Sequence, residues 1–392
     1  MQSKTEHKLN SIPKISKKEQ FLKDPDIARW HNTLARSSKI TASVKVKNLE
    51  LFCRENGINA HDIIRLAKED SKRLRDLVLD YIAYKEEQGR SMSYIENFIK
   101  ALKSWLRYWD LELPKSIKIS VIKKHSNERI PNEYEYTDII NRADIRARVM
   151  IALISKAGLR MQVLGNYDGT DGLRLKDMPD IQVINGKAIC KQYPCMIKVR
   201  VELSKNRRPY ITFLSKQGVK YLLAYLNDRI KNGEVLNEDS PIIAWDNKHR
   251  YGYPKHRKSR FLITNSISDE VRKAVKPYKF RPYVFRSYFD TQLLLAESKG
   301  RINRDFRQFF MGHSGDIEHV YTLHKGMLPE YIINEMRDAY NRCEEYLDLE
   351  VSNKDKEEEE LKNKAHSIIE QLGKEELLNL LALTSRGNNL SK

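Results

Sequence analysis

The sequence has few cysteines, no long apolar run and a deficit of acidic residues, and each shortage excludes a class of protein. Four cysteines in 392 residues are too few for the disulfide framework of a small secreted domain. No stretch approaches the roughly 18–20 consecutive apolar residues of a membrane span, and the N-terminus lacks the apolar core of a signal peptide. We therefore expect a cytoplasmic protein that does not insert into a membrane.

The spacing of the cysteines also does not match that of a metal site. Cys190 and Cys195 flank an expected turn, but no second pair of cysteines or histidines follows at the spacing of a zinc site. The sequence therefore predicts neither a bound metal nor a cofactor.

The deficit of acidic residues leaves a strongly basic chain. Lysine and arginine number 71 against 53 aspartates and glutamates, which gives a formal net charge of +18. This excess favours a polyanion as partner, and nucleic acid is the leading candidate because bound Lys and Arg release counterions condensed on the phosphate backbone. The alternative is a basic protein that binds no polyanion.

The hydrophobic content of the chain, 40%, excludes a disordered protein.

Changes in composition and periodicity divide the chain into five segments. Residues 1–20 are lysine-rich and aperiodic, which predicts a flexible basic arm. Apolar stripes over residues 21–113 predict a small helical domain, and the lysine-rich stretch 114–132 predicts an extended linker. Residues 133–347 are predicted to form a larger second domain, and residues 348–392 an acidic spacer followed by an amphipathic helix.

Most apolar residues repeat at helical spacing, and a short region alternates as strands do. Ser93 is predicted to cap a helix through a capping box with Glu96, and one long helix is predicted over residues 137–154. Alternation over residues 199–203, a turn at SKNRR and a return over residues 209–214 predict a β-hairpin. The expected fold class is mostly α with a small antiparallel β-sheet (α+β).

Five side chains with catalytic potential follow one another along the second domain. They are two arginines, a lysine, a histidine and a tyrosine, in this order. Such a set allows the tyrosine phenol to attack a phosphodiester without a metal, while the basic residues stabilise the developing charge. Plainer explanations stay open: a buried salt bridge for each arginine, a solvated turn for the lysine and a packed helix position for the tyrosine. The five residues are Arg160 after AGL, Lys205 in the hairpin turn, Arg286 at the end of RPYVFR, His313 after MG, and Tyr321.

At these positions the chain resembles the tyrosine recombinase (integrase) family, in particular the integrases of archaeal chromosomes, viruses and plasmids. The resemblance implies a helical DNA core-binding domain, then a catalytic domain that cuts and rejoins double-stranded DNA through a 3′-phosphotyrosyl intermediate and a Holliday junction. It also implies a homotetramer on DNA that is a monomer or dimer when free. It runs from about residue 24 to about residue 347 and depends on AGLR at 157–160, Lys205, YVFR at 283–286, MGH at 311–313 and Tyr321.

The resemblance also implies a role for each of the five residues. Tyr321 would attack the scissile phosphate and must lose its proton as it does so. Arg160 and Arg286 would bind the non-bridging oxygens, and His313 would add a hydrogen bond. Lys205 would protonate the leaving 5′-oxygen as general acid.

Two positions depart from the family pattern. Tyr283 replaces the first histidine of the H-x-x-R motif, and it leaves open which group accepts the proton from Tyr321. Val163 stands where the family commonly has an acidic residue, so Arg160 must be supported from elsewhere. Tyr283 and Tyr288 are the alternative nucleophiles.

Contacts with the DNA backbone are expected from basic residues of the helical domain and of the hairpin turn, although each one alone is more simply a solvated position. Two other functions stay open: a type IB topoisomerase that relaxes DNA, and a DNA-binding or architectural protein without catalysis. The DNA-contact candidates are Lys39, Lys45, Lys100, Lys103, Arg207 and Arg208.

Overall fold

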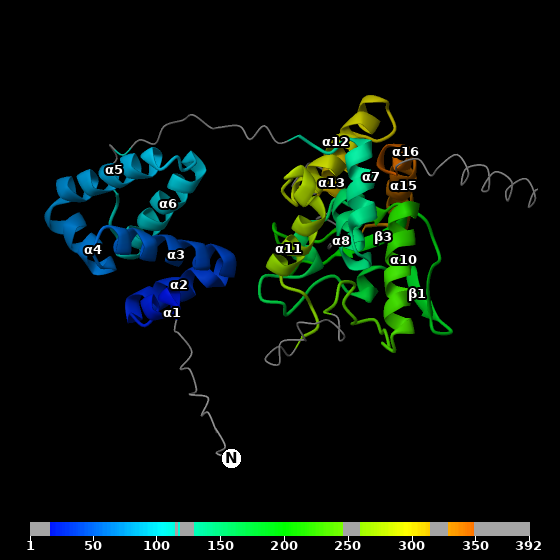
Figure 1. The fold of residues 1–392 in the computed structure, drawn as a ribbon, viewed down its shortest axis with the longest axis horizontal. Coiled ribbons are helices and arrows are strands. Elements are labelled where there is room, and N and C mark those ends of the chain that lie inside the picture. The colour runs from blue at the N-terminus through cyan, green and yellow to red at the C-terminus, as the bar shows by residue number, and fades with distance from the viewer. Residues whose placement is uncertain (1–15, 114–116, 118–128, 246–258, 314–327, 349–392) are drawn as a thin grey trace, which may run out of the picture. The chain divides into compact units, whose positions relative to one another are not determined.

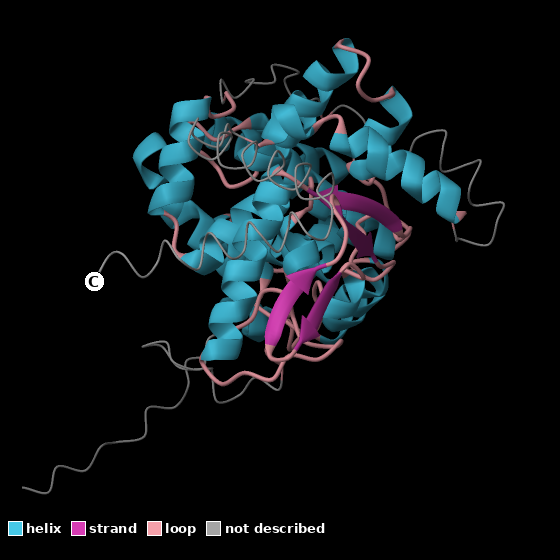
Figure 2. Ribbon diagram, turned by 90° about the vertical axis from the view of Figure 1, so that its right-hand side faces the viewer, coloured by secondary structure: helices cyan, strands magenta, loops and turns pink. Residues whose placement is uncertain are grey.

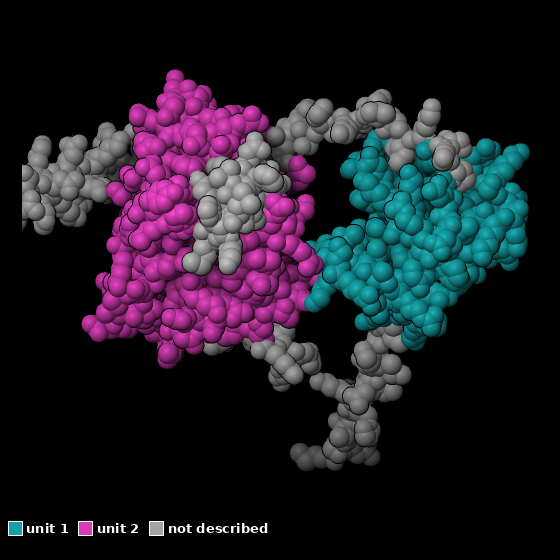
Figure 3. All heavy atoms as spheres, turned by 180° about the vertical axis from the view of Figure 1, so that it is seen from behind, with its two compact units in different colours: residues 1–127 teal, residues 128–392 magenta. Residues whose placement is uncertain are grey.

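The chain forms two compact units, residues 1–127 and residues 128–392 (Figures 1 and 3). The computed structural model describes residues 16–113, 117, 129–245, 259–313 and 328–348. None of the helices in these ranges combines the length and the apolar character that a membrane crossing requires.

The first unit is helical over its described residues. Its core contains two tryptophans from α2 and α6, Trp30 and Trp105, whose rings meet edge to face at 5.3 Å between centroids. Phe52 of α3 is fully buried beside them in the same cluster. The helices are α1 (Lys17–Phe21), α2 (Pro25–Ser37), α3 (Lys39–Glu55), α4 (Ala60–Glu69), α5 (Ser71–Glu87) and α6 (Met92–Tyr108).

Two predictions for this unit are wrong, and helix capping explains both. Residues 17–20 of the predicted flexible arm belong to α1, because Ser16 and Glu19 form a capping box and Lys18 Nζ donates to Ser43 Oγ at 2.8 Å. The predicted cap at Ser93 lies inside α6, whose cap stands two residues earlier, where Ser91 accepts from the backbone N–H of Tyr94. Residues 1–15 of the arm lie outside the described residues.

The second unit packs helices around the buried helix α8 and carries two small antiparallel sheets (Figure 2). The predicted fold class is confirmed, with the strands in two separate two-stranded sheets. The elements are α7 (Glu133–Arg142), α8 (Ile145–Ser155), α9 (Met161–Leu164), η1 (Leu175–Asp177), β1 (Ile181–Ile184), β2 (Lys187–Cys190), β3 (Cys195–Val199), β4 (Tyr210–Leu214), α10 (Lys216–Lys231), α11 (Thr264–Val275), η2 (Lys276–Tyr278), α12 (Val284–Ser298), α13 (Arg304–Phe310), α15 (Glu330–Asn341) and α16 (Glu344–Leu347).

The single helix predicted over residues 137–154 is wrong, because the chain breaks between α7 and α8. Ala143 has an extended backbone, and Asp144 caps α8 by accepting from the N–H of Ala147 at 2.8 Å. Almost every residue of α8 is buried, since α10, α11 and α12 pack around it. The C-terminus of this buried helix leads directly into AGLR and therefore fixes where that segment begins.

The predicted hairpin exists as β3 and β4, but its first strand lies earlier in the chain than expected. Val199 pairs with Tyr210, and residues 200–209 form the connecting loop. The alternation over residues 199–203 therefore mispredicts the strand end. Its physical cause is Arg200, whose guanidinium donates to Asp171 and Asp177, each at 2.9 Å, and turns the chain away from the sheet.

Candidate active site

The AGLR segment makes a sharp turn that only glycine fits. Gly158 has φ +64°, and a Cβ there would lie 2.5 Å from the ring of Phe289. The turn directs Arg160, at the N-terminus of α9, toward the MGH segment, where its Nη1 donates to the carbonyl of Gly312 at 3.5 Å. Two predicted motifs far apart in the sequence therefore meet.

Arg286 lies at the centre of this arrangement. It stands in the first turn of α12, and only 1% of it is exposed. Its Nη1 donates to the carbonyl of Gly158 and its Nη2 to the carbonyl of Met311, while its buried Nε has no partner among the described residues. One guanidinium thus joins the AGLR turn to the MGH segment.

The two arginines are near enough for their charges to repel each other, and no acid among the described residues neutralises them. Burial lowers the pKa of Arg286, and the charge of Arg160 lowers it further, while Tyr210 and Tyr283 oppose the shift. In the described part of the chain the hydrogen-bond partners of both guanidinium groups are backbone carbonyls. The alternative of a buried salt bridge therefore fails for both arginines within these residues.

Tyr210 also belongs to this site, although no motif in the sequence indicates it. It is 5% exposed, and its hydroxyl has no hydrogen-bond partner among the described residues. Burial raises its pKa, while the charges of Arg286 and Arg160 act to lower it, so the phenol lies beside both. Gly312 (φ +56°) covers the ring, since a Cβ there would approach it to 2.7 Å.

His313 extends the same site at the end of α13. Its Nδ1 contacts Gln308 Oε1 at 2.9 Å, which orients the ring, and Nε2 has no hydrogen-bond partner among the described residues. Burial lowers the pKa of His313, and the charges of Arg286 and Arg160 lower it further. The imidazole is therefore neutral near pH 7 until an anion offsets the two arginines.

The loop between β3 and β4 brings Lys205 beside these residues. Lys205 is exposed, but its neighbour Asn206 donates from Nδ2 to the carbonyl of Gly312 at 3.4 Å, the same oxygen that Arg160 contacts. Tyr283 lies three residues before Arg286 and is 54% exposed. The predicted nucleophile Tyr321 falls in residues 314–327, outside the described residues, and stays a prediction.

Sequence signals for the missed residues exist, but they are weak. Tyr210 is the inward-facing residue at which the chain enters β4 after Lys205, so strand alternation marks it as buried without marking it as functional. Asn206 and Gln308 carry no pattern of their own. They act through contacts with the MGH segment that only the fold creates.

The predicted DNA contacts differ in their surroundings. Lys45 is half-buried between α3 and α6, donates to Ser104 Oγ at 2.9 Å, and has its pKa lowered by burial and by Arg107. Lys100 forms an ion pair with Glu96 on its own helix at 2.8 Å. The other four, Lys39, Lys103, Arg207 and Arg208, are exposed.

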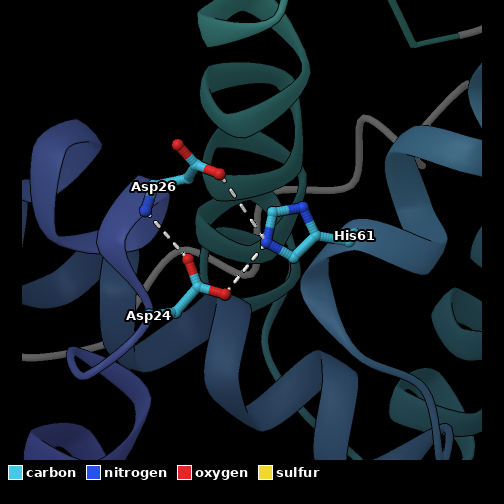
Figure 4. Close-up of side chains that lie close together, drawn as sticks. All are labelled: Asp24, Asp26 and His61. Carbon is cyan, nitrogen blue, oxygen red and sulfur yellow. Dashed lines mark hydrogen bonds and ion pairs between the residues drawn. The ribbon is translucent and has the colours of Figure 1, made fainter.

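One cluster in the first unit could hold a metal ion by its residue types, but its contacts are structural. Asp24, Asp26 and His61 have ligand atoms within 4.8 Å of one another (Figure 4). Asp24 uses Oδ1 to cap α2, accepting from the N–H of Asp26 at 2.9 Å, and Oδ2 to bind His61 at 2.9 Å. The cluster therefore fastens the start of α4 to the start of α2.

No protein-family model and no curated protein sequence matches the chain. Solved structures of recombinases and integrases do. The crystal structure of XerA recombinase shares 18% identity over 79% of this chain and 96% of that one, with a TM-score of 0.33. The integrase from mycobacterium phage Brujita shares 14% over 84% and 96% (TM-score 0.37). A lambda integrase(75–356) dimer bound to a COC′ core site shares 15% over 74% and 94% (TM-score 0.46). At such low similarity, function has to be argued from this chain's own residues.

Proposed function

We propose that the protein is a tyrosine-type site-specific recombinase that cuts and rejoins double-stranded DNA without a metal or cofactor. The observation that carries the proposal is the convergence of Arg160 and Arg286 in one site without a carboxylate partner among the described residues. Two such charges are held together at a cost in free energy, and a bound anion removes that cost.

A phosphodiester is the anion that this geometry suits. Guanidinium groups offer paired N–H donors in the arrangement that two non-bridging phosphate oxygens accept. Backbone carbonyls already fix both side chains, so the donors need no rearrangement as charge builds on the phosphorus. The hydroxyl of Tyr210 and the Nε2 of His313, both without a partner in the described part of the chain, would supply two further polar contacts.

Tyr321 is the proposed nucleophile, eight residues after His313 in the sequence. Eight residues of extended chain reach at most roughly 29 Å, ample for the phenol to return to the site. A phenol of ordinary pKa near 10 must give up its proton during attack, and Lys205 in the β3–β4 loop would protonate the leaving 5′-oxygen. A free 5′-hydroxyl from another strand then reverses the step and rejoins the DNA.

Assembly follows from the chemistry. Exchange between two duplexes breaks four strands, and each break consumes one tyrosine, so a full exchange through a Holliday junction needs four copies of the chain. The net charge of +18 and the half-buried Lys45 beside Arg107 support contact with the DNA backbone. We propose a homotetramer on DNA, formed from monomers or dimers, that acts in the cytoplasm.

A nicked suicide duplex tests the proposal. Footprinting on DNA from either side of the gene supplies the site. A nick just 3′ of the scissile phosphate traps the covalent intermediate, because the short fragment that carries the free 5′-hydroxyl diffuses away. We expect a protein–DNA adduct that Tyr321→Phe abolishes and Tyr283→Phe retains. If Tyr283→Phe abolished the adduct and Tyr321→Phe retained it, Tyr283 would be the nucleophile.

The same assay separates the two alternative functions. Intact DNA binding without any adduct would identify a non-catalytic DNA-binding protein. Adduct formation with relaxation of any supercoiled plasmid, but no strand exchange between two sites, would identify a type IB topoisomerase.

A further inference from the structure

One residue, Asp180, binds both ends of the loop between β2 and β3. Asp180 accepts the backbone N–H of Lys191 on its carbonyl at 2.8 Å and the N–H of Met196 on its carboxylate at 2.7 Å. The two ends of the loop are therefore held together. Cys190, the last residue of β2, and Cys195, the first of β3, stand directly beside these anchored positions.

The two thiols are close enough for each to shift the pKa of the other, but they differ in their access to solvent. Cys195 is fully buried and its Sγ donates to the carbonyl of Met196 at 3.8 Å, while Cys190 Sγ donates to the carbonyl of Gln192 at 3.1 Å. Cys190 is partly exposed, and the residues that follow it, Lys191 and Gln192, are exposed as well. A small reagent in water can therefore reach Cys190, and Cys195 lies behind it.

We propose that Cys190 and Cys195 form a dithiol site that reacts with low-molecular-weight disulfides to give an intramolecular disulfide. Cys190 loses its proton and attacks one sulfur of the reagent, which forms a mixed disulfide and releases one reagent thiol carrying that proton. Cys195 then loses its proton and attacks Cys190 Sγ, which forms the protein disulfide and releases the second reagent thiol. Two protein thiols are oxidised, and one reagent disulfide is reduced.

The order of attack follows from the two environments. The neighbouring Cys195 thiol lowers the pKa of Cys190, and the contact with Gln192 and the charge of Arg337 act in the same direction, while burial and Asp180 oppose them. The net shift favours the thiolate that begins the exchange. The neighbouring Cys190 thiol and burial raise the pKa of Cys195. Cys190 is therefore the attacking thiol and Cys195 the resolving one.

The other two cysteines serve as internal controls. Cys53 and Cys343 are buried at 3% and 0% exposure, and burial raises the pKa of each thiol to about 12. Neither is expected to react while the protein is folded.

The dithiol site lies beside α15, which contacts both the anchoring residue and the loop. Arg337 of α15 donates from Nη1 to Asp180 at 2.9 Å and also to the carbonyl of Pro194, inside the loop. Because Asp180 already holds both ends of the loop, we expect the disulfide to form without displacing α15.

The test is oxidation of the folded, full-length chain with oxidised glutathione, followed by alkylation, denaturation and digestion with trypsin. Trypsin cuts after Lys191, so the expected disulfide joins two peptides, residues 188–191 and residues 192–198. Cys53 and Cys343 should stay reduced. Thermal unfolding should occur at the same or a higher temperature after oxidation.

Two variants make the order of attack testable. Cys195→Ser should accumulate a stable mixed disulfide on Cys190, whereas Cys190→Ser should leave Cys195 unmodified until the protein unfolds. Circular dichroism before oxidation confirms that each variant folds. The proposal is overturned if wild-type Cys190 stops at the mixed disulfide, if all four cysteines react at equal rates, or if oxidation lowers the unfolding temperature.

Discussion

Replacing Tyr210 by phenylalanine should separate stability from catalysis. The change removes one oxygen, which is buried at 5% residue exposure and has no hydrogen-bond partner among the described residues. A buried hydroxyl without a partner costs about 1–3 kcal/mol, so Tyr210→Phe should raise the free energy of unfolding by up to that amount. The same change removes a donor that we assign to the scissile phosphate.

The catalytic loss follows from the strength of that donor. A hydrogen bond to a charged group contributes about 1.5–3 kcal/mol, which corresponds to roughly 10- to 150-fold in the rate of adduct formation. Urea unfolding measures the first effect, and single-turnover cleavage of the nicked duplex measures the second. A more stable protein that cleaves more slowly is the expected combination.

Tyr225 provides the matched control. It is also 5% exposed, but its hydroxyl accepts the backbone N–H of Ala244 at 3.3 Å. Tyr225→Phe should therefore lower the free energy of unfolding by about 0.5–1.5 kcal/mol and leave the cleavage rate unchanged. If Tyr210→Phe also destabilised the protein, or cleaved at the wild-type rate, its hydroxyl would not be the unpartnered donor described above.

Three further perturbations test other parts of the molecule. Arg286→Lys loses the paired contacts to Gly158 and Met311 and should slow single-turnover cleavage by roughly 100- to 1,000-fold; unchanged cleavage would contradict its role at the phosphate. Lys45→Ala should weaken DNA binding and reduce the slope of log affinity against log salt concentration by about 1, measured by titration at several salt concentrations, while an unchanged slope would exclude a phosphate contact. Burial raises the pKa of Glu344 from 4.5 to about 7, so its contribution to stability is complete below pH 4.5 and is lost as the pH rises through 7. Glu344→Gln should therefore gain stability relative to the wild type at pH 8 but not at pH 4, as measured by urea unfolding at both values.

The sequence predicted the convergence of distant motifs better than the local boundaries. Arg160, Arg286 and His313 meet as expected, because glycine before Arg160 and a helix start before Arg286 constrain the backbone strongly. The strand end at Val199 and the break at Ala143 were mispredicted. Both depend on contacts of single polar side chains, and hydrophobic periodicity carries no information about such contacts.

The role of Tyr210 could not have been predicted for a different reason. Strand alternation predicts only that a tyrosine at this position is a buried core residue. Its position near two guanidinium groups arises only when β4 packs against the MGH segment, where Gly312 leaves room for the ring. The departure at Tyr283 was visible in the sequence, but its 54% exposure was not.

The candidate site concentrates several unfavourable features that one ligand would relieve together. Arg160 and Arg286 repel each other, the hydroxyl of Tyr210 and the Nε of Arg286 lack partners among the described residues, and His313 is held neutral. A single phosphodiester placed between the arginines would offset their repulsion, accept a hydrogen bond from the phenol of Tyr210 and favour the protonated imidazole. These features lower the stability of the free protein, and a bound ligand that satisfied them would stabilise the fold by mass action.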